Sequence, residues 1–135
     1  MKQCAVLVIN VDGRKTPHRV ALEKAGFRVL ETCEWPDDGV VGAFQVVVVL
    51  LRQVETLSML GARLRAKAHF GRRVLIAVVP GETSATQRRC GVDSGFDDVV
   101  QEAPESRVLL ARILRQLRAR PEYRCFLPDP KRRAA

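Results

Sequence analysis

Few residues in this sequence have the types and the spacing that covalent chemistry requires. The run Asp12-Gly13-Arg14-Lys15 suggests a phosphate-binding loop at first sight, but it lacks the glycine spacing of either common nucleotide motif. His18 has the chemistry of a general base, yet the sequence identifies neither a nucleophile nor an orienting partner for it. We therefore interpret the run as an ordinary turn and His18 as a packed or surface histidine, and we predict no catalytic residue.

The spacing of cysteines and histidines predicts no metal site. The chain has two histidines, and none of its cysteines forms a CxxC pair; they are Cys4, Cys33, Cys90 and Cys125. A zinc site needs ligands in close pairs. Cys4 and Cys90 lie in or beside apolar segments, where a free thiol behaves as a small hydrophobic group. We expect structural thiols, no metal and no other cofactor.

The composition is that of one globular domain with a basic balance. The chain has 135 residues, of which 47% are hydrophobic and 28% charged, and its formal net charge is +8. A basic balance favours acidic partners and nucleic acid. The basic residues are spread over several segments, however, and five Phe, one Tyr and one Trp offer no stacking platform for bases. Nucleic-acid binding is therefore the less favoured alternative.

Nothing in the sequence predicts a membrane segment. The longest apolar run, Val46 to Leu51, has the length of a strand and falls well short of the roughly 18 residues of a membrane span. The first residues lead directly into a strand-like segment, without the apolar core and cleavage site of a signal peptide. We expect a cytoplasmic protein without membrane contact.

Apolar runs alternate with helical patterns along the chain. Continuous apolar segments at 5–9, 46–51 and 74–79 indicate strands buried on both faces of a parallel sheet. An alternating pattern predicts a second strand at 27–32, and 96–101 holds a short strand. Helical spacing predicts helices at 17–25, 55–70, 83–90 and 105–120, the second and third of these ending at Gly71 and Gly91. Any helix between 39 and 44 has room for about two turns. This alternation implies right-handed crossovers and a sheet covered by helices on both faces.

The alternating pattern stops at Pro121. We expect one domain over residues 1–120, followed by a C-terminal tail or the start of a linker at 121–135. Tyr123, Phe126 and Leu127 are apolar enough to dock back onto the domain, so a loose and a docked segment before Pro128 both stay open.

Four stretches, taken in order, resemble the receiver domain of bacterial two-component response regulators. An opening strand and turn lie at 6–13, and a helix end leading into a second strand lies at 22–29. A glycine and acidic approach to a fifth strand lies at 91–100, and a last helix lies at 109–117. The resemblance covers roughly residues 4 to 119. It implies a flavodoxin-like, three-layer α/β/α fold with a five-stranded parallel sheet in the order 2-1-3-4-5 and a short second helix.

A working receiver has a defined phosphoryl chemistry. Two carboxylates after the first strand hold Mg²⁺, and an Asp at the end of the third strand accepts the phosphoryl group. A Thr or Ser after the fourth strand and a Lys after the fifth contact the phosphoryl oxygens.

The resemblance carries these roles onto residues that cannot perform them. The acidic pair falls on Asn10 and Val11, with the acid Asp12 beside them, and the acceptor falls on Leu50. The hydroxyl falls on Val79, with a register that is open by one residue, and the lysine falls on Glu102. A leucine cannot accept a phosphoryl group, and a glutamate at the lysine position repels one. The resemblance therefore implies a degenerate pseudo-receiver that is not phosphorylated on aspartate.

The resemblance also implies a surface for partners. In this family the fourth helix, the fifth strand and the fifth helix often form dimer or partner interfaces. The charged residues expected near this side are Arg88, Arg89, Asp97, Asp98, Arg112, Arg115 and Arg118. A basic helix beside an acidic strand makes two faces that can complement each other in a second copy. The alternative is an ordinary solvated face.

We therefore predict a non-catalytic module of a two-component-like signalling system that binds a protein partner or itself. Two alternatives stay open. One is a basic nucleic-acid-binding regulator. The other is a flavodoxin-like protein that binds a small ligand at the carboxyl edge of the strands, near Asn10, Asp12, Leu50 and Pro80. Trp35 is expected either to cover the sheet edge or to be an exposed contact.

Overall fold

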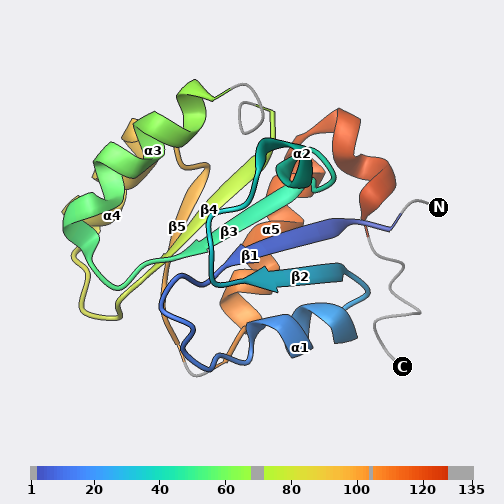
Figure 1. Ribbon diagram of the computed structural model, residues 1–135, viewed down its shortest axis with the longest axis horizontal. Coiled ribbons are helices and arrows are strands. Elements are labelled where there is room, and N and C mark those ends of the chain that lie inside the picture. Colours follow the sequence, from blue (N-terminus) through green and yellow to red (C-terminus); the bar gives the residue numbers. More distant parts are fainter. Residues whose placement is uncertain (1–2, 68–71, 104, 128–135) are drawn as a thin grey trace.

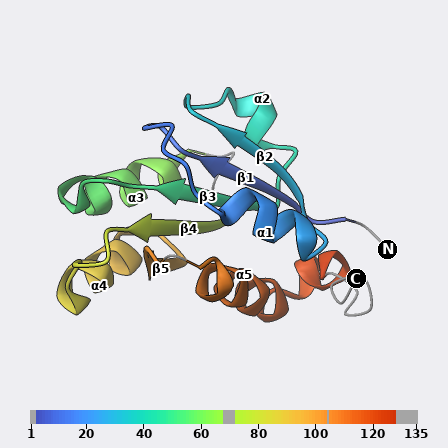
Figure 2. The ribbon, with the colours of Figure 1, turned by 90° about the horizontal axis from the view of Figure 1, so that it is seen from below.

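Five parallel strands form one sheet in the computed structural model, which describes residues 3–67, 72–103 and 105–127. The sheet has the order β2-β1-β3-β4-β5, as the sequence predicts, and Figure 2 shows the strands in this order. The strands are β1 (Ala5–Ile9), β2 (Arg28–Thr32), β3 (Val46–Leu50), β4 (Val74–Val79) and β5 (Asp98–Gln101). β1, β3 and β4 are buried along their whole length, which explains their unbroken runs of Val, Leu and Ile.

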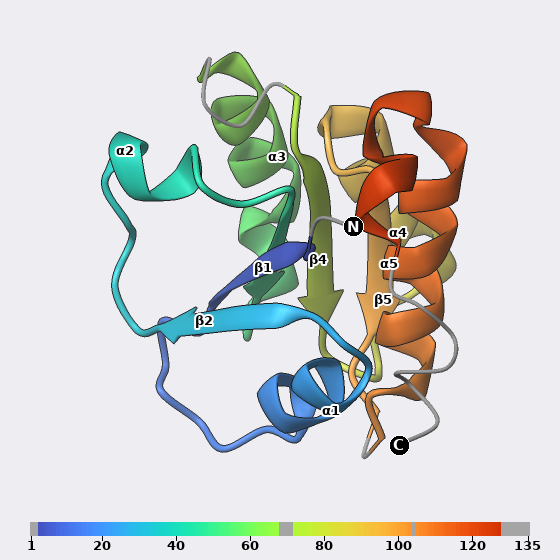
Figure 3. The same cartoon turned by 90° about the vertical axis from the view of Figure 1, so that its right-hand side faces the viewer.

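Helices cover both faces of the sheet, so the predicted three-layer α/β fold is confirmed (Figures 1 and 3). The helices are α1 (His18–Lys24), α2 (Asp38–Val41), α3 (Leu57–Ala66), α4 (Ala85–Ser94) and α5 (Arg107–Ala119), with short 3-10 helices at Val54–Thr56 and Pro121–Phe126. α1 and α5 pack on one apolar core, and α2 and α3 pack on the other. No helix among the described residues has the length and apolarity to cross a membrane.

Strand side chains alternate between the two cores. Val6 and Val8 of β1 face the α1 and α5 side, whereas Leu7 and Ile9 face the α2 and α3 side. On α5 the buried positions include Leu109, and its neighbour Val108 is 47% exposed. This settles which of these two adjacent residues belongs to the inner face of the helix.

The predicted end of α4 at Gly91 is wrong, because the helix continues to Ser94 and stops at Gly95, where φ is +142°. Gly91 serves close packing instead of termination. A Cβ at this position would lie 2.7 Å from Cδ2 of Leu57 and 2.9 Å from Cγ2 of Val99. The missing side chain therefore lets α4 approach α3 and β5 closely.

Other helix boundaries also differ from the sequence prediction. α3 begins at Leu57, after a 3-10 turn, and its predicted end at Gly71 lies outside the described residues. α2 is a single turn. The short α2 covers its side of the sheet incompletely, and Leu30 on the neighbouring β2 is 45% exposed.

The segment after α5 docks against the domain. Pro121–Phe126 forms a 3-10 helix, and the side chain of Tyr123 is buried. The Tyr123 hydroxyl donates a hydrogen bond of 2.6 Å to the carbonyl oxygen of Arg72, and its ring meets that of Phe126 edge to face. Apolar contact and a partly buried hydrogen bond therefore hold this segment against the domain.

Candidate functional site

The residues that the sequence analysis assigned to a degenerate phosphorylation site gather at the carboxyl edge of the sheet. Asn10, Val11 and Asp12 directly follow β1, and Leu50 and Val79 are the last residues of β3 and β4. Glu102 directly follows β5. The parallel register aligns these strand ends, with Leu50 opposite Val78 and Val79 opposite Gln101. The carboxyl edge of a doubly wound sheet is where such folds place their sites.

Leu50 is a core residue. Its side chain is 3% exposed and packs in the core on the α1 and α5 side of the sheet. It carries no atom that binds a metal or attacks phosphorus. The position that the resemblance assigns to the acceptor is thus occupied by a buried hydrocarbon side chain.

Asn10 connects the loop after β1 to β2 at this edge instead of facing a cation. Its side chain is 2% exposed, and its Nδ2 donates to the carbonyl oxygen of Arg14 at 2.7 Å and to Oε2 of Glu31 at 3.1 Å. The Asn10 Oδ1 has no hydrogen-bond partner among the described residues. Asn10 therefore fixes the loop after β1 against β2.

Glu102 contacts Arg14 and His18, which lie far from it in the sequence. Its Oε2 lies 3.2 Å from a guanidinium nitrogen of Arg14, and its Oε1 lies 3.0 Å from Nε2 of His18. The other ring nitrogen of His18, Nδ1, lies 2.7 Å from the Ser106 hydroxyl. One neutral tautomer satisfies both contacts, because Nε2–H then donates to Glu102 while Nδ1 accepts from Ser106.

This cluster reverses the polarity that the resemblance implies. A receiver has acids after its first strand and a lysine after its fifth, whereas this chain has Arg14 after β1 and Glu102 after β5. His18 is 2% exposed, so the interpretation of a packed histidine is confirmed. Sequence reasoning missed the cluster, because 84 to 88 residues separate its partners and no local pattern links them.

Asp12 is exposed and pairs with Arg52, with Oδ2 and Nε 3.4 Å apart. Among the described residues no group of three His, Cys, Asp or Glu side chains is arranged to hold a metal ion. Asp12 therefore brings a single carboxylate to this edge, already beside a guanidinium group.

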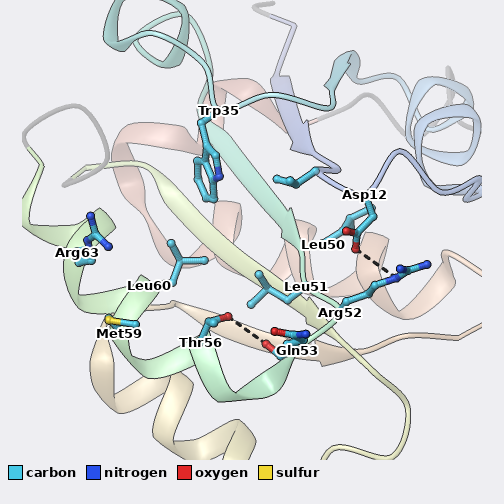
Figure 4. A pocket seen from close by; sticks show the side chains of 11 residues that line it. Asp12, Trp35, Leu50, Leu51, Arg52, Gln53, Thr56, Met59, Leu60 and Arg63 are labelled. Carbon is cyan, nitrogen blue, oxygen red and sulfur yellow. Dashed lines mark hydrogen bonds and ion pairs between the residues drawn. The ribbon is translucent and has the colours of Figure 1, made fainter.

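A groove of about 510 Å³ opens beside Asp12, between the loop after β1, the end of β3 and α3 (Figure 4). We call it the Trp35 groove. Its lining residues are Val11, Asp12, Trp35, Leu50, Leu51, Arg52, Gln53, Thr56, Met59, Leu60 and Arg63. Trp35 is 46% exposed, so its side chain does not fully cover the sheet edge, and its role as a contact stays a prediction. The sequence analysis named Asp12 and Leu50 near a possible ligand site, but no pattern in the sequence predicts that Trp35 and α3 complete the groove.

The charged residues predicted for the α4, β5 and α5 side fall into two groups. Arg88 and Arg112 line a shallow depression of about 280 Å³ together with Val108, while Arg89, Arg115 and Arg118 are exposed. The acids are paired within the chain. Asp98 lies 3.1 Å from Arg112.

Asp97 belongs to a structural network at the amino end of β5. Its carboxylate accepts from the backbone N–H of Leu75 at 2.7 Å and contacts guanidinium nitrogens of Arg65 at 2.7 Å and Arg120 at 2.8 Å. It joins β4, α3 and the end of α5. Asp97 therefore has a structural role, unlike the basic residues that are exposed at the surface.

The four cysteines are all free thiols, in different surroundings. Cys4 is buried, and burial raises the pKa of its thiol from 9.0 to about 12. Cys90 is exposed on α4, so the expectation that it packs as a small hydrophobic group is wrong. The reason is again the orientation of α4, which turns Gly91 and not Cys90 toward α3.

No protein-family model matches the sequence, and no curated protein matches it either. The fold does match solved response regulators. A response regulator from Thermotoga maritima is 18% identical, with a TM-score of 0.65, over 84% of this chain and 97% of its own. An orphan response regulator of H. pylori is 20% identical, with a TM-score of 0.61, over 84% and 96%. A CheY-like receiver domain from Methanospirillum hungatei is 17% identical, with a TM-score of 0.54, over 87% and 96%. The chain therefore has the receiver fold.

Proposed function

We propose that the chain is a receiver-like signalling module that is not phosphorylated on aspartate, has no catalytic activity, and acts by binding a protein partner or a second copy of itself. The observation that carries this proposal is Leu50, a buried leucine at the end of β3. Phosphoryl transfer needs a nucleophilic oxygen at that point, and a hydrocarbon side chain has none.

The electrostatics of the edge support the same proposal. Glu102 brings a negative charge to the position from which a lysine would contact a phosphoryl group. The Glu102 carboxylate is paired with the guanidinium group of Arg14 and contacts His18. A phosphoryl dianion placed there meets a carboxylate, which repels it where a lysine would stabilise its charge.

For the partner surface we propose the α4, β5 and α5 side, defined by Arg88, Val108, Arg112, Arg115 and Arg118. Val108 is an exposed apolar side chain among arginines, beside a shallow depression. Interfaces combine such an apolar centre with a polar rim, and arginine is enriched in them. The surface fits an acidic partner protein, and in a second copy the Val108 surfaces can pack on each other across a two-fold axis.

We place the module in the cytoplasm. Cys33, Cys90 and Cys125 are exposed and free. Exposed thiols persist in a reducing compartment and tend to be oxidised outside it.

The test is a titration with beryllofluoride and Mg²⁺, followed by amide chemical shifts, with a working receiver as positive control. Beryllofluoride mimics a phosphoryl group on a competent aspartate. We expect shifts in the control and none at Asp12, Leu50 or Glu102 of this chain. Incubation with acetyl phosphate, followed by mass spectrometry, should show no added phosphoryl group. Stoichiometric phosphorylation of any aspartate would overturn the proposal.

A further inference from the structure

We propose that the Trp35 groove binds a planar aromatic molecule that carries a carboxylate. This inference goes beyond the partner-binding role, because it uses a different surface and needs no partner protein. It names a class of ligand for a groove that lies beside the degenerate phosphorylation positions.

The size and the walls of the groove fit a small aromatic ligand. Its volume of about 510 Å³ lies within the roughly 300–1,000 Å³ of small-molecule sites. Figure 4 shows the indole of Trp35 reaching in from one side, toward Leu50 and Leu60. An indole on one side and aliphatic side chains on the other can enclose a flat ring, and stacked or edge contacts with an indole favour an aromatic one.

Apolar side chains around the groove are left in contact with water. Val11, Trp35 and Met59 are among the large apolar residues with the most exposed surface in the described part of the chain, at 48%, 46% and 59%. They come from three separate segments and converge on one groove. An aromatic ligand would remove this surface from water, which is favourable in proportion to the apolar area covered.

The charged residues that line the groove favour an anionic ligand over a neutral or cationic one. Arg52 and Arg63 both line the groove, whereas Asp12 is the single acid among the lining residues whose side chains the structure describes. Asp12 already pairs with Arg52, while Arg63 has no ion pair or hydrogen bond within the described ranges. Among the described residues Arg63 is therefore a guanidinium group of the groove without a paired acid, and carboxylates are the partners that guanidinium groups bind in bidentate geometry.

Three probes with the same ring system test this inference: 2-naphthoate, the neutral 2-naphthylmethanol and the cationic 2-naphthylmethylamine. The readout is the indole N–H resonance of Trp35, which is unambiguous because the chain has one tryptophan, together with amide shifts. We expect saturable shifts at Trp35, Leu51 and Leu60 with 2-naphthoate. The neutral probe should bind about three- to tenfold more weakly, since it loses a partly exposed charge-assisted contact, and the cation more weakly still.

Substitutions distinguish the contribution of the charged contact to probe affinity from the contribution of the apolar contact. Arg63→Ala should weaken 2-naphthoate by about the same factor as removal of the probe's charge, and should leave 2-naphthylmethanol unchanged. Met59→Glu, at an exposed position, should weaken both probes. Lys24→Ala, at an exposed basic position on α1, is the control and should change neither. Equal affinity for all three probes, shifts away from the groove, or an absence of saturable shifts would overturn the proposal.

Discussion

Nε2 of the buried His18 lies 3.0 Å from Oε1 of Glu102, across the carboxyl edge of the sheet. This contact joins the first residue of α1 to the residue after β5, and the Ser106 hydroxyl holds the opposite side of the imidazole. Arg14 completes the cluster at the second oxygen of Glu102. Glu102 therefore links the end of β5 to the loop after β1 and to the start of α1 at this edge of the sheet.

The first prediction concerns Glu102→Lys, which introduces the residue type that a working receiver has at this position. The ammonium group would lie beside Arg14 and would leave His18 Nε2 without its acceptor. We expect the free energy of unfolding to fall by about 2–3 kcal/mol, measured by urea denaturation. Glu102→Gln keeps an acceptor for His18 and should cost about 1 kcal/mol. A lysine variant as stable as the parent would contradict the role assigned to this cluster.

The second prediction concerns the amino end of β5. Asp97→Ala removes an acceptor shared by the Leu75 N–H, Arg65 and Arg120, and leaves partly buried donors unpaired. We expect a loss of about 2–4 kcal/mol in the free energy of unfolding. The control is Asp93→Ala, because Asp93 forms an exposed pair with Arg89 one helical turn away. That change should cost about 0.5 kcal/mol or less, and equal losses in the two variants would contradict the network.

The strands could be predicted from the sequence, since continuous apolar runs indicate buried strands. The observed bounds of β1 and β4 coincide with their apolar runs, and the strand order follows from the receiver resemblance. The end of α4 could not be predicted. Gly91 looks like a terminator in sequence, and only the distance to Leu57 shows that it permits close packing.

The candidate site was predictable in position but not in its contacts. The strand ends could be found, because parallel strands bring their carboxyl ends to one edge. The partners of Glu102 could not, because Arg14 and His18 are distant in sequence and both residue types are common on surfaces. The Trp35 groove depends on a short α2 and on the path of the loop before it, neither of which has a periodic signal.

The third prediction follows from the packing of α4. Gly91→Ala places a Cβ 2.7 Å from Leu57 and 2.9 Å from Val99, so α4 must shift away from α3. We expect a loss of about 1–3 kcal/mol in the free energy of unfolding. Gly39→Ala is the matched control in α2, where nothing lies within 4 Å of the added Cβ. It should be neutral, or stabilising by up to about 1 kcal/mol through helix propensity. Similar effects at both glycines would be inconsistent with the close approach.

The fourth prediction is a pH dependence from Cys4. Its thiol pKa is raised from 9.0 to about 12 by burial, so between these values the unfolded thiol ionises while the folded one stays protonated. The unfolded state then binds fewer protons, and the free energy of unfolding falls as the pH rises from 9 toward 12. Cys4→Ala should show a shallower fall over this range than the parent.

Thiol counting gives an independent check on Cys4. At pH 8 an aromatic disulfide reagent should modify Cys33, Cys90 and Cys125 in the folded protein, and Cys4 only after unfolding in denaturant. Rapid modification of Cys4 in the folded protein would show that its surroundings are wetter than this packing implies.

The fifth prediction tests the proposed partner surface on α5. Val108→Glu replaces an exposed apolar side chain beside Arg88 and Arg112 with a charge, and should weaken association through this side by about tenfold or more. Val20→Glu makes the same change at a similarly exposed valine on α1 and should leave association unchanged. Sedimentation velocity over a concentration series measures self-association of the parent and both variants. Both substitutions should change stability by about 0.5 kcal/mol or less, because the positions are exposed. If the two valine variants associate equally well, the α4, β5 and α5 side is not the dimer surface. If the parent chain stays monomeric over the whole concentration series, the partner to seek is an acidic protein, and the same pair of variants tests its binding.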